Sequence, residues 1–382
     1  MNNIKPRKIW NRVLIVHPFG IGDVLFITPV IRSLKEQGVQ KIDLLLGSRT
    51  REIFKYHPDV NEMFEWSKDR PKTIKARLER WASLLKMFFC IWRNRYEAML
   101  DFSLSREYAF LGKFVFGIPV RAGFDFKQRG IFLSHKISLS EGFNGKPVAE
   151  YYLELLESLG IKKEKSRLEF FLGQEDLEEK NKIFKQNGIA EDESYLVVAP
   201  GGGESWGKDA HLKRWPLEHF AALICQMSRE YGSLFQSVVI LGSKSENELG
   251  KELKGLLSGF RVFNFCGQIP IRASAAIMKH AKLVLANDGG IVHLASALKV
   301  PVVAIYGPVD HNVYGPYPKN PLSLAIYHPS LSCRPCYRKM RYQSGCCSVE
   351  CLKSLSPEYV FSVIKSEKLI GQLLGDRKAG KV

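Results

Sequence analysis

Residues 287–298 read NDGGIVHLASAL and lie between two short apolar runs, residues 283–286 and 300–306. Such runs, separated by a helical pattern, predict two parallel strands that are joined through a helix. An Asp and two glycines therefore fall where the first strand turns into the helix, at the edge of a parallel sheet where ligands bind. Glycine lets the backbone approach an anion closely, and the free N–H groups of a helix start favour negative charge. The stretch predicts a diphosphate site.

The same arrangement occurs near the start of the chain. Residues 13–16 predict a buried strand, and Gly20, Gly22 and Asp23 follow it before a helical pattern begins. Two interpretations of Asp23 are open, because an Asp at such a position is commonly a helix N-cap but also suits a binding loop. Thr28 is a second cap candidate, for a helix that begins at the proline after it.

Short apolar runs alternate with helical patterns over most of the chain. The runs are residues 13–16, 41–46 and 98–102 in the first half, and residues 195–199, 237–241, 261–265 and 283–286 in the second. This alternation predicts parallel sheets with helices on both faces. The length of 382 residues, and the restart of the pattern after a polar linker at residues 188–194, predict two domains. We therefore expect an α/β fold in which two Rossmann-like domains face each other across a ligand-binding cleft.

The predicted domain limits follow from the linker. The N-terminal domain is expected to cover residues 1–188 and the C-terminal domain residues 189–355. A last helical stretch, within residues 356–382, is expected to pack back on the N-terminal domain.

The formal net charge of +17 indicates an anionic partner, which is a nucleotide phosphate, a phosphorylated glycolipid, a membrane surface or a nucleic acid. The chain has no helix-turn-helix, RNA-binding or zinc-finger signature, so nucleic acid is not expected. It has neither a signal-peptide pattern at its start nor an apolar stretch of about 18 residues that would span a bilayer. The sequence thus predicts a cytoplasmic protein.

Residues 81–92 are strongly apolar, and Arg77, Arg80, Arg93 and Arg95 flank them. The favoured interpretation is a buried helix with basic ends, because short apolar helices are more often part of a core. The alternative is a helix that lies flat on an anionic bilayer, as a peripheral contact with the cytoplasmic face of the inner membrane.

Five of the eight cysteines are clustered in the sequence. They are Cys333, Cys336, Cys346, Cys347 and Cys351. Four of the five would suffice for a structural zinc site, although the second pair lacks the usual C-x2-C spacing. Free thiols or a redox pair are the alternative, since disulfides are rare in the cytosol.

Four motifs in order resemble glycosyltransferase family 9, the ADP-heptose:lipopolysaccharide heptosyltransferases and their relatives. They are Gly22-Asp23-Val24-Leu25 with Thr28-Pro29; Pro200-Gly201-Gly202 with Lys213-Arg214-Trp215-Pro216; Asn287-Asp288-Gly289-Gly290 with His293-Leu294-Ala295; and Pro301 with Tyr306-Gly307-Pro308. The likeness covers about residues 10 to 365. The resemblance implies a GT-B fold and an inverting sugar transfer, without a metal, from a nucleotide diphosphate sugar. ADP-heptose is the expected donor, and the expected acceptor is a hydroxyl of a lipopolysaccharide core or a similar anionic glycolipid or oligosaccharide.

The resemblance also implies roles for individual residues. Asp23, in the loop with Gly20 and Gly22, corresponds to the general base that takes the acceptor proton. The donor residues implied are Lys213 for the diphosphate, Glu246 for the ribose, Asp288 for sugar hydroxyls, the turn Gly289 and Gly290, and His293 one helical turn later. His293 also suits a packed core histidine, Lys213 a surface cation and Glu246 a surface acid.

One position departs from the family pattern. Gly289 stands where relatives usually have Ser or Thr, so a hydroxyl contact to phosphate is lost while the backbone N–H remains. Three rival functions are a nucleotide-sugar epimerase of the same fold, a dinucleotide-dependent oxidoreductase and a non-catalytic glycan-binding relative. The glycine spacing at Gly20 and Gly22 does not fit the G-x-G-x-x-G turn that an oxidoreductase needs.

Overall fold

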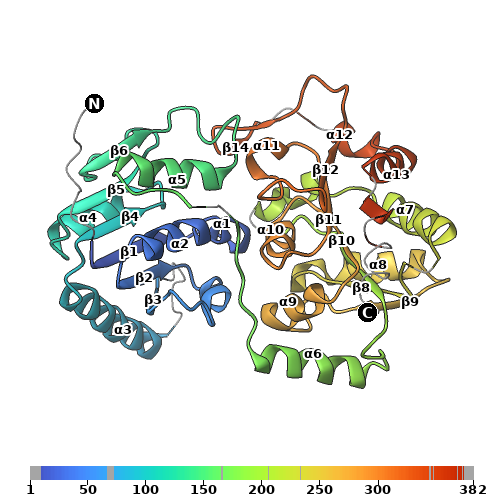
Figure 1. Cartoon of the computed structure of the whole chain (residues 1–382), viewed down its shortest axis with the longest axis horizontal. Helices are drawn as coiled ribbons and strands as arrows, with labels where there is room; N and C mark the ends of the chain where they lie inside the picture. Colours follow the sequence, from blue (N-terminus) through green and yellow to red (C-terminus); the bar gives the residue numbers. More distant parts are fainter. Residues whose placement is uncertain are drawn as a thin grey trace. The chain divides into compact units, whose positions relative to one another are not determined.

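The computed structural model describes residues 10–66, 73–164, 167–204, 206–232, 234–343, 346, 348–367, 369–371 and 373. The chain divides into two compact units, Met1–Ser166 and Arg167–Val382. Each unit is built on a parallel six-stranded sheet (Figure 1).

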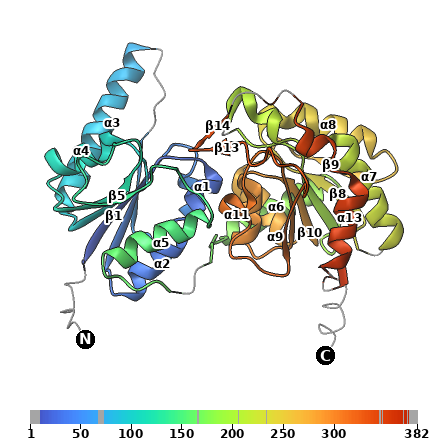
Figure 2. The same cartoon turned by 90° about the horizontal axis from the view of Figure 1, so that it is seen from above.

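The sheet of the first unit has the strand order β3-β2-β1-β4-β5-β6. Its strands are β1 (Arg12–His17), β2 (Lys41–Leu46), β3 (Glu62–Glu65), β4 (Ala98–Asp101), β5 (Val120–Asp125) and β6 (His135–Ser138). Its helices are α1 (Ile21–Leu25), α2 (Thr28–Glu36), α3 (Ile74–Arg93), α4 (Arg106–Phe114) and α5 (Val148–Ser158), with a 3-10 turn at Arg51–Phe54. Figure 2 shows α3 and α4 on one face of this sheet and α2 and α5 on the other.

The sheet of the second unit has the order β12-β11-β10-β7-β8-β9. Its strands are β7 (Tyr195–Ala199), β8 (Ser237–Ile240), β9 (Arg261–Asn264), β10 (Leu283–Asn287), β11 (Val302–Tyr306) and β12 (Ser323–Tyr327). The main helices are α6 (Gln174–Gln186), α7 (Leu217–Glu230), α8 (Asn247–Leu256), α9 (Ile271–Lys279), α10 (Gly290–Ala297) and α13 (Pro357–Ser366). The unit also has short helices, α11 (His311–Tyr314) and α12 (Glu350–Lys353), 3-10 turns at Gly207–Lys213 and Lys244–Glu246, and a hairpin of β13 (Tyr337–Arg338) and β14 (Arg341–Tyr342).

The two sheets have the same topology when the strands of each unit are counted from its own start. Both follow the Rossmann order 3-2-1-4-5-6, and all their strand pairs are parallel. The direction of winding reverses between β1 and β4 in the first unit and between β7 and β10 in the second. Ligands bind at the carboxyl ends of the strands at such a reversal. The predicted α/β architecture of two Rossmann-like domains is confirmed.

Residues 167–187 belong to the second unit, so the boundary lies between Ser166 and Arg167 rather than after residue 188. Helix α6 packs on α9, and the buried Arg272 of α9 forms a bidentate pair with Asp176 of α6, with N–O distances of 2.9 and 2.6 Å. The linker prediction was based on glycine and polar residues after α6, which are only the turn that leads into β7.

Helix α13 packs against α7 and β12 of its own unit. Val360, Phe361 and Ile364 are buried in the same core cluster as Phe220 of α7. The described part of this helix thus belongs to the core of the second unit, and its expected docking on the N-terminal domain stays a prediction.

Helix α3 differs from the favoured sequence interpretation. Only Met87 and Ile91 of this helix are buried, whereas Trp81 and Leu85 are each 65% exposed. The stretch 81–92 is thus an amphipathic surface helix and not a buried one. In the part of the chain that the structure covers, no helix is long and apolar enough to cross a bilayer.

Candidate functional site

The carboxyl ends of β7 and β10 carry the glycine-containing loops of the second unit, and one buried side chain joins them. Asn287, at the end of β10, accepts a hydrogen bond from the backbone N–H of Trp215 at 3.1 Å. Its amide nitrogen donates to the carbonyl of Pro200, after β7, at 2.7 Å. Asn287 therefore fixes the Pro200 turn and the segment around Lys213 on the end of β10.

Lys213 and Asp288 form a buried ion pair at this edge. The Nζ of Lys213 lies 2.7 Å from Oδ2 of Asp288, and both side chains are 6% exposed. Lys213 also lies over the ring of Trp206, 5.0 Å from its centroid. A buried pair of opposite charges is costly to desolvate and gains little stability over an apolar pair, so its presence at a strand end points to binding. The surface-cation interpretation of Lys213 is wrong.

Glu246 is also buried, and it joins two loops. Its carboxylate accepts the backbone N–H of Gly203 at 2.9 Å and that of Ser243 at 2.8 Å. Gly201 has to be glycine, because a Cβ there would lie 1.8 Å from Oε1 of Glu246. Glu246 is thus no surface acid, and it fixes the loops after β7 and β8 next to each other.

The turn Gly289–Gly290 begins helix α10, and His293 lies one turn later. Gly289 has an extended backbone with φ of 170°, which any residue adopts, so this glycine is not needed for conformation. A Cβ at Gly289 would lie 3.4 Å from the carbonyl oxygen of Gly202, an ordinary contact. Burial lowers the pKa of His293 to about 4, the charge of Asp288 opposes this shift, and Lys213 adds to it. The ring of His293 is therefore neutral near pH 7 and lies close to the ion pair.

The loop after β1 in the first unit contains Asp23. Gly20 is the N-cap residue of α1, and Asp23 is the third residue of that helix, so Asp23 is not the N-cap. Its Oδ2 lies 3.8 Å from where a Cβ on Gly20 would be, so the carboxylate folds back over the glycine loop. Thr28 is not a cap either, since its hydroxyl donates to the carbonyl of Leu25 at 2.8 Å and Ile27 is the N-cap of α2.

The buried Tyr152 of α5 lies near Asp23 and is paired with a buried histidine. His17, the last residue of β1, has its Nε2 3.2 Å from the hydroxyl of Tyr152 on α5. Burial lowers the pKa of His17 to about 3. Burial and the nearby charge of Asp23 raise the pKa of the Tyr152 hydroxyl well above 10. Asp23 thus has the neutral hydroxyl of Tyr152 close by, and this hydroxyl is paired with the neutral ring of His17.

A further carboxylate occurs at the end of β4. Asp101 is 4% exposed, and its Oδ1 accepts the backbone N–H of Ser103 at 2.9 Å. Burial raises the pKa of Asp101 to about 6, and hydrogen bonds from Ser103 oppose that shift only in part. This residue lies beside the reversal of winding in the first unit.

The cysteine cluster is partly described. Cys347 lies outside the described residues, and within them no group of three or more His, Cys, Asp or Glu side chains is arranged to hold a metal ion. The hairpin β13–β14 nevertheless returns the chain to Cys336, whose carbonyl accepts the N–H of Gln343 at 3.1 Å. Tyr337 of the hairpin stacks on Trp206, with ring centroids 5.1 Å apart. The cluster therefore borders the Lys213 segment.

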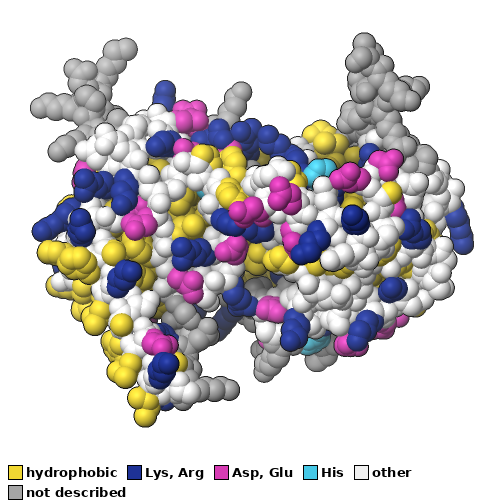
Figure 3. Space-filling view, turned by 90° about the horizontal axis from the view of Figure 1, so that it is seen from below, with side chains coloured by type: hydrophobic (Ala, Val, Ile, Leu, Met, Phe, Trp, Pro, Cys, Tyr) yellow, Lys and Arg dark blue, Asp and Glu magenta, His cyan; other side chains and the backbone are white. Residues whose placement is uncertain are grey.

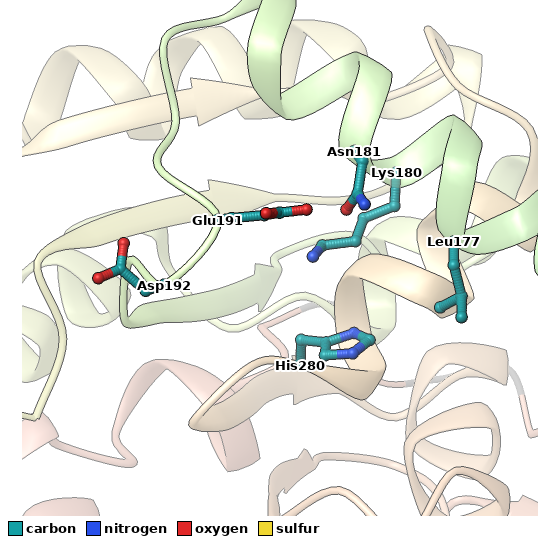
Figure 4. Close-up of a pocket in the computed structure, with 6 residues that line it drawn as sticks. All are labelled: Leu177, Lys180, Asn181, Glu191, Asp192 and His280. Atoms are coloured by element: carbon teal, nitrogen blue, oxygen red, sulfur yellow. The ribbon is translucent and has the colours of Figure 1, made fainter.

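Figure 4 shows a pocket of about 380 Å³ elsewhere in the second unit. It is lined by Leu177, Lys180 and Asn181 of α6, by Glu191, Asp192 and by His280. These residues precede β7 and β10, so the pocket lies at the amino ends of the strands. It is distinct from the site around Lys213 and Asp288.

The family model for glycosyltransferase family 9 (heptosyltransferase) matches residues 85–344 of the chain. The chain belongs to glycosyltransferase family 9. This glycosyltransferase is 25% identical over 362 residues to lipooligosaccharide heptosyltransferase 2 of Campylobacter jejuni serotype O:2, a match that covers 93% of the chain and 98% of the relative. It is also 25% identical over 306 residues to lipopolysaccharide heptosyltransferase 2 of Escherichia coli K12, covering 78% of the chain and 83% of the relative.

Solved structures share the fold of this glycosyltransferase. The E. coli ADP-heptose lps heptosyltransferase II superposes with a TM-score of 0.68 at 20% identity, covering 96% of this chain and 99% of that one. The E. coli heptosyltransferase WaaC with ADP superposes with a TM-score of 0.67 at 21% identity, covering 93% and 99%. The predicted family and the GT-B class are confirmed.

The sequence interpretation missed Asn287 as a positioning residue, although its motif begins there. It also missed Asp101 and the pair His17 and Tyr152. His17 directly follows the predicted run 13–16, and Asp101 lies one residue before the end of the predicted run 98–102. A polar side chain near the end of such a run is a usable signal in a parallel sheet. Tyr152 gave no such signal, because it lies on the apolar face of a helix.

Proposed function

We propose that this glycosyltransferase moves heptose from ADP-heptose to a hydroxyl of a lipopolysaccharide core, with inversion and without a metal in the transfer step. The observation that carries the donor assignment is the buried pair of Lys213 and Asp288 at the reversal of winding, beside the start of α10. A buried cation and free helix N–H groups favour a diphosphate. WaaC, one of the structural relatives, is known with ADP and with ADP-2-deoxy-2-fluoro heptose, which supports this donor class.

Lys213 and the N–H groups of Gly289 and Gly290 stabilise the charge that develops on the leaving diphosphate. Asp288 holds hydroxyls of the sugar, and its ion pair with Lys213 fixes the position of the carboxylate. Glu246 uses one lone pair on each oxygen for Gly203 and Ser243, and each oxygen keeps a second lone pair for a ribose hydroxyl. His293, neutral near pH 7, adds a hydrogen-bonding group without adding charge.

Asp23 takes the proton from the acceptor hydroxyl as the sugar transfers. A general base has to be aimed at the proton that it removes, and the glycines Gly20 and Gly22 let an acceptor hydroxyl approach the carboxylate. The low pKa of His17 and the high pKa of Tyr152 leave both groups uncharged near pH 7. Neither group therefore adds a positive charge beside the Asp23 carboxylate.

A donor screen tests the proposal. Nucleoside diphosphate release is measured from ADP-heptose, a GDP-sugar and a UDP-sugar, each with and without a core oligosaccharide acceptor. We expect release from ADP-heptose that depends on the acceptor and persists in EDTA, and a product whose anomeric configuration is opposite to that of the donor. Turnover of a UDP-sugar without any acceptor would instead support an epimerase.

We also propose that four of the five clustered cysteines hold a structural zinc. The C-x2-C turn at Cys333 and Cys336 is followed by the β13–β14 hairpin, which returns the chain to Cys336. Paired thiols on a turn beside a hairpin are typical ligands of structural zinc. Elemental analysis of the purified chain should find one zinc per chain, lost in Cys333→Ser and Cys336→Ser and kept in Cys225→Ser. A zinc-free chain of unchanged thermal stability would contradict this proposal.

A further inference from the structure

Helix α3 carries an unpartnered apolar stripe. Ile74, Leu78, Trp81, Leu85, Phe89 and Trp92 recur at helical spacing, and each is exposed. With about 100° between successive residues, these six side chains fall within an arc of roughly 80°. Figure 2 shows the N-terminal part of α3 standing clear of the rest of the first unit. The buried residues of the helix, Met87 and Ile91, lie on a different face, so the stripe is not what attaches α3 to the sheet.

The apolar surface continues on the neighbouring elements. Phe110 and Phe114 of α4 are 43% and 58% exposed, and their rings lie 4.9 Å apart. Both contact the ring of Phe132, and Ile131 beside it is 56% exposed. In Figure 3 hydrophobic side chains gather at the left and lower left, over α4 and α3, with Lys and Arg among them. Contiguous exposed apolar surface of this kind marks an interaction site.

The charges around the stripe point to one kind of partner. Helix α3 contains five basic residues, Lys75, Arg77, Arg80, Lys86 and Arg93, and a single acidic one, Glu79. Arg95 follows the helix and lies over the ring of Trp92, 4.7 Å from its centroid. A helix with an aromatic and aliphatic face bordered by Lys and Arg lies in the interface of an anionic bilayer, with the apolar face among the acyl chains and the cations at the headgroups.

We infer that the stripe of α3, together with Phe110 and Phe114 of α4, binds an anionic lipid bilayer. A second copy of the chain fits this face less well, because pairing two stripes would bring two strongly basic helices together. The assignment does not depend on the sugar that is transferred. It gives the enzyme a way to reach an acceptor that is embedded in a membrane.

Vesicle flotation tests this inference, with vesicles of phosphatidylcholine alone and vesicles to which phosphatidylglycerol is added. The wild-type chain should float with the anionic vesicles and not with the neutral ones. The triple variant Trp81→Gln, Leu85→Gln, Phe89→Gln should bind about a hundredfold more weakly, because it loses its apolar insertion. The double variant Lys86→Gln, Arg93→Gln should bind about 25-fold more weakly, from about fivefold for each cation near the surface.

Matched controls come from the second unit. Leu256→Gln removes an exposed apolar residue and Lys251→Gln an exposed cation, and neither should change vesicle binding. All substituted side chains are exposed, so circular dichroism and release of nucleoside diphosphate with a water-soluble acceptor should match the wild type. The inference is wrong if the triple variant floats as well as the wild type. It is also wrong if the wild type does not float with anionic vesicles and instead forms a dimer that is lost in the triple variant.

Discussion

Both units have a buried carboxylate where their fourth strand ends, but the surroundings of the two groups differ. Asp288 follows β10 and has the cation of Lys213 at 2.7 Å. Asp101 ends β4, and the groups that act on it are the hydrogen bonds of Ser103 and the like charge of Glu107. The same topology thus contains a carboxylate paired with a cation in the second unit and, in the first, a carboxylate whose pKa burial raises to about 6. The two sheet edges therefore differ in the charge that surrounds their carboxylates.

The largest effect is expected from Asp23, since the first unit has to supply the base. Asp23→Asn keeps the size of the side chain and removes its basicity, so kcat should fall about a thousandfold. Binding of ADP-heptose, measured by calorimetry, should remain unchanged, because the donor residues belong to the second unit. Asp192→Asn, in the pocket of Figure 4, is the control and should leave kcat unaltered. Nearly full activity of the Asp23→Asn variant would show that Asp23 is not the general base.

In the second unit, substitution of Lys213 tests the role of its ion pair with Asp288. Lys213→Met should lower kcat/KM about a hundredfold, because the leaving diphosphate loses its cation. It should also cost about 3–5 kcal/mol of unfolding free energy, because Asp288 is left buried without a partner. The exposed pair of Lys365 and Glu230 is a control, and Lys365→Met should leave the unfolding free energy nearly unchanged, because solvent screens a surface pair.

A second variant separates stability from function at the same pair. In Lys213→Met, Asp288→Leu the unpaired charge is gone, so chemical denaturation should show most of the stability restored while transfer stays lost. If activity returned together with stability, the ion pair would be a structural element and not a donor site.

The sequence predicts some strands of the two sheets better than others. Apolar runs such as residues 195–199 were enough to predict the central strands, because a parallel sheet buries both of its faces. Strands β3, β5, β6 and β12 were missed, since each of them is only partly buried. The membership of α6 in the second unit depends on the pair of Asp176 and Arg272, 96 residues apart, which no local pattern reveals.

Helix α3 illustrates a different limit. Its apolar residues have a helical period, and that period indicates one apolar face without telling whether protein or solvent faces it. For the site, motif order predicts Lys213, Glu246 and Asp288 as donor residues, whereas their depth of burial results from the packing of the chain. Asn287 was adjacent to these residues in sequence, but its two hydrogen bonds join segments 72 and 87 residues away.

The raised pKa of Asp101 can be tested through the pH dependence of the unfolding free energy. Because its pKa in the folded chain is raised to about 6, the folded state holds this proton more tightly than the unfolded state does. Its contribution to stability is full below about pH 4 and is lost as the pH rises to about 6. In Asp101→Asn that loss is absent, so the unfolding free energy of the variant relative to the wild type should rise by about 3 kcal/mol between pH 4 and pH 7. A difference that is constant across this range would show that Asp101 ionises normally.

The smallest effect is expected at Gly289, the position that departs from the family pattern. Its backbone is extended and a Cβ meets only the carbonyl oxygen of Gly202 at 3.4 Å, so Gly289→Ser should fold with unchanged stability. The added hydroxyl lies at the start of α10, where it can donate to the donor phosphate, and a neutral hydrogen bond is worth about 1 kcal/mol. We expect the Kd for ADP to fall about fivefold by calorimetry. Gly201→Ser is the contrasting variant. Its Cβ would lie 1.8 Å from Oε1 of Glu246 and would displace the carboxylate that holds the loops after β7 and β8 together. If Gly289→Ser left ADP affinity unchanged while Gly201→Ser abolished it, the diphosphate would be held by the loop after β7 and not by the start of α10.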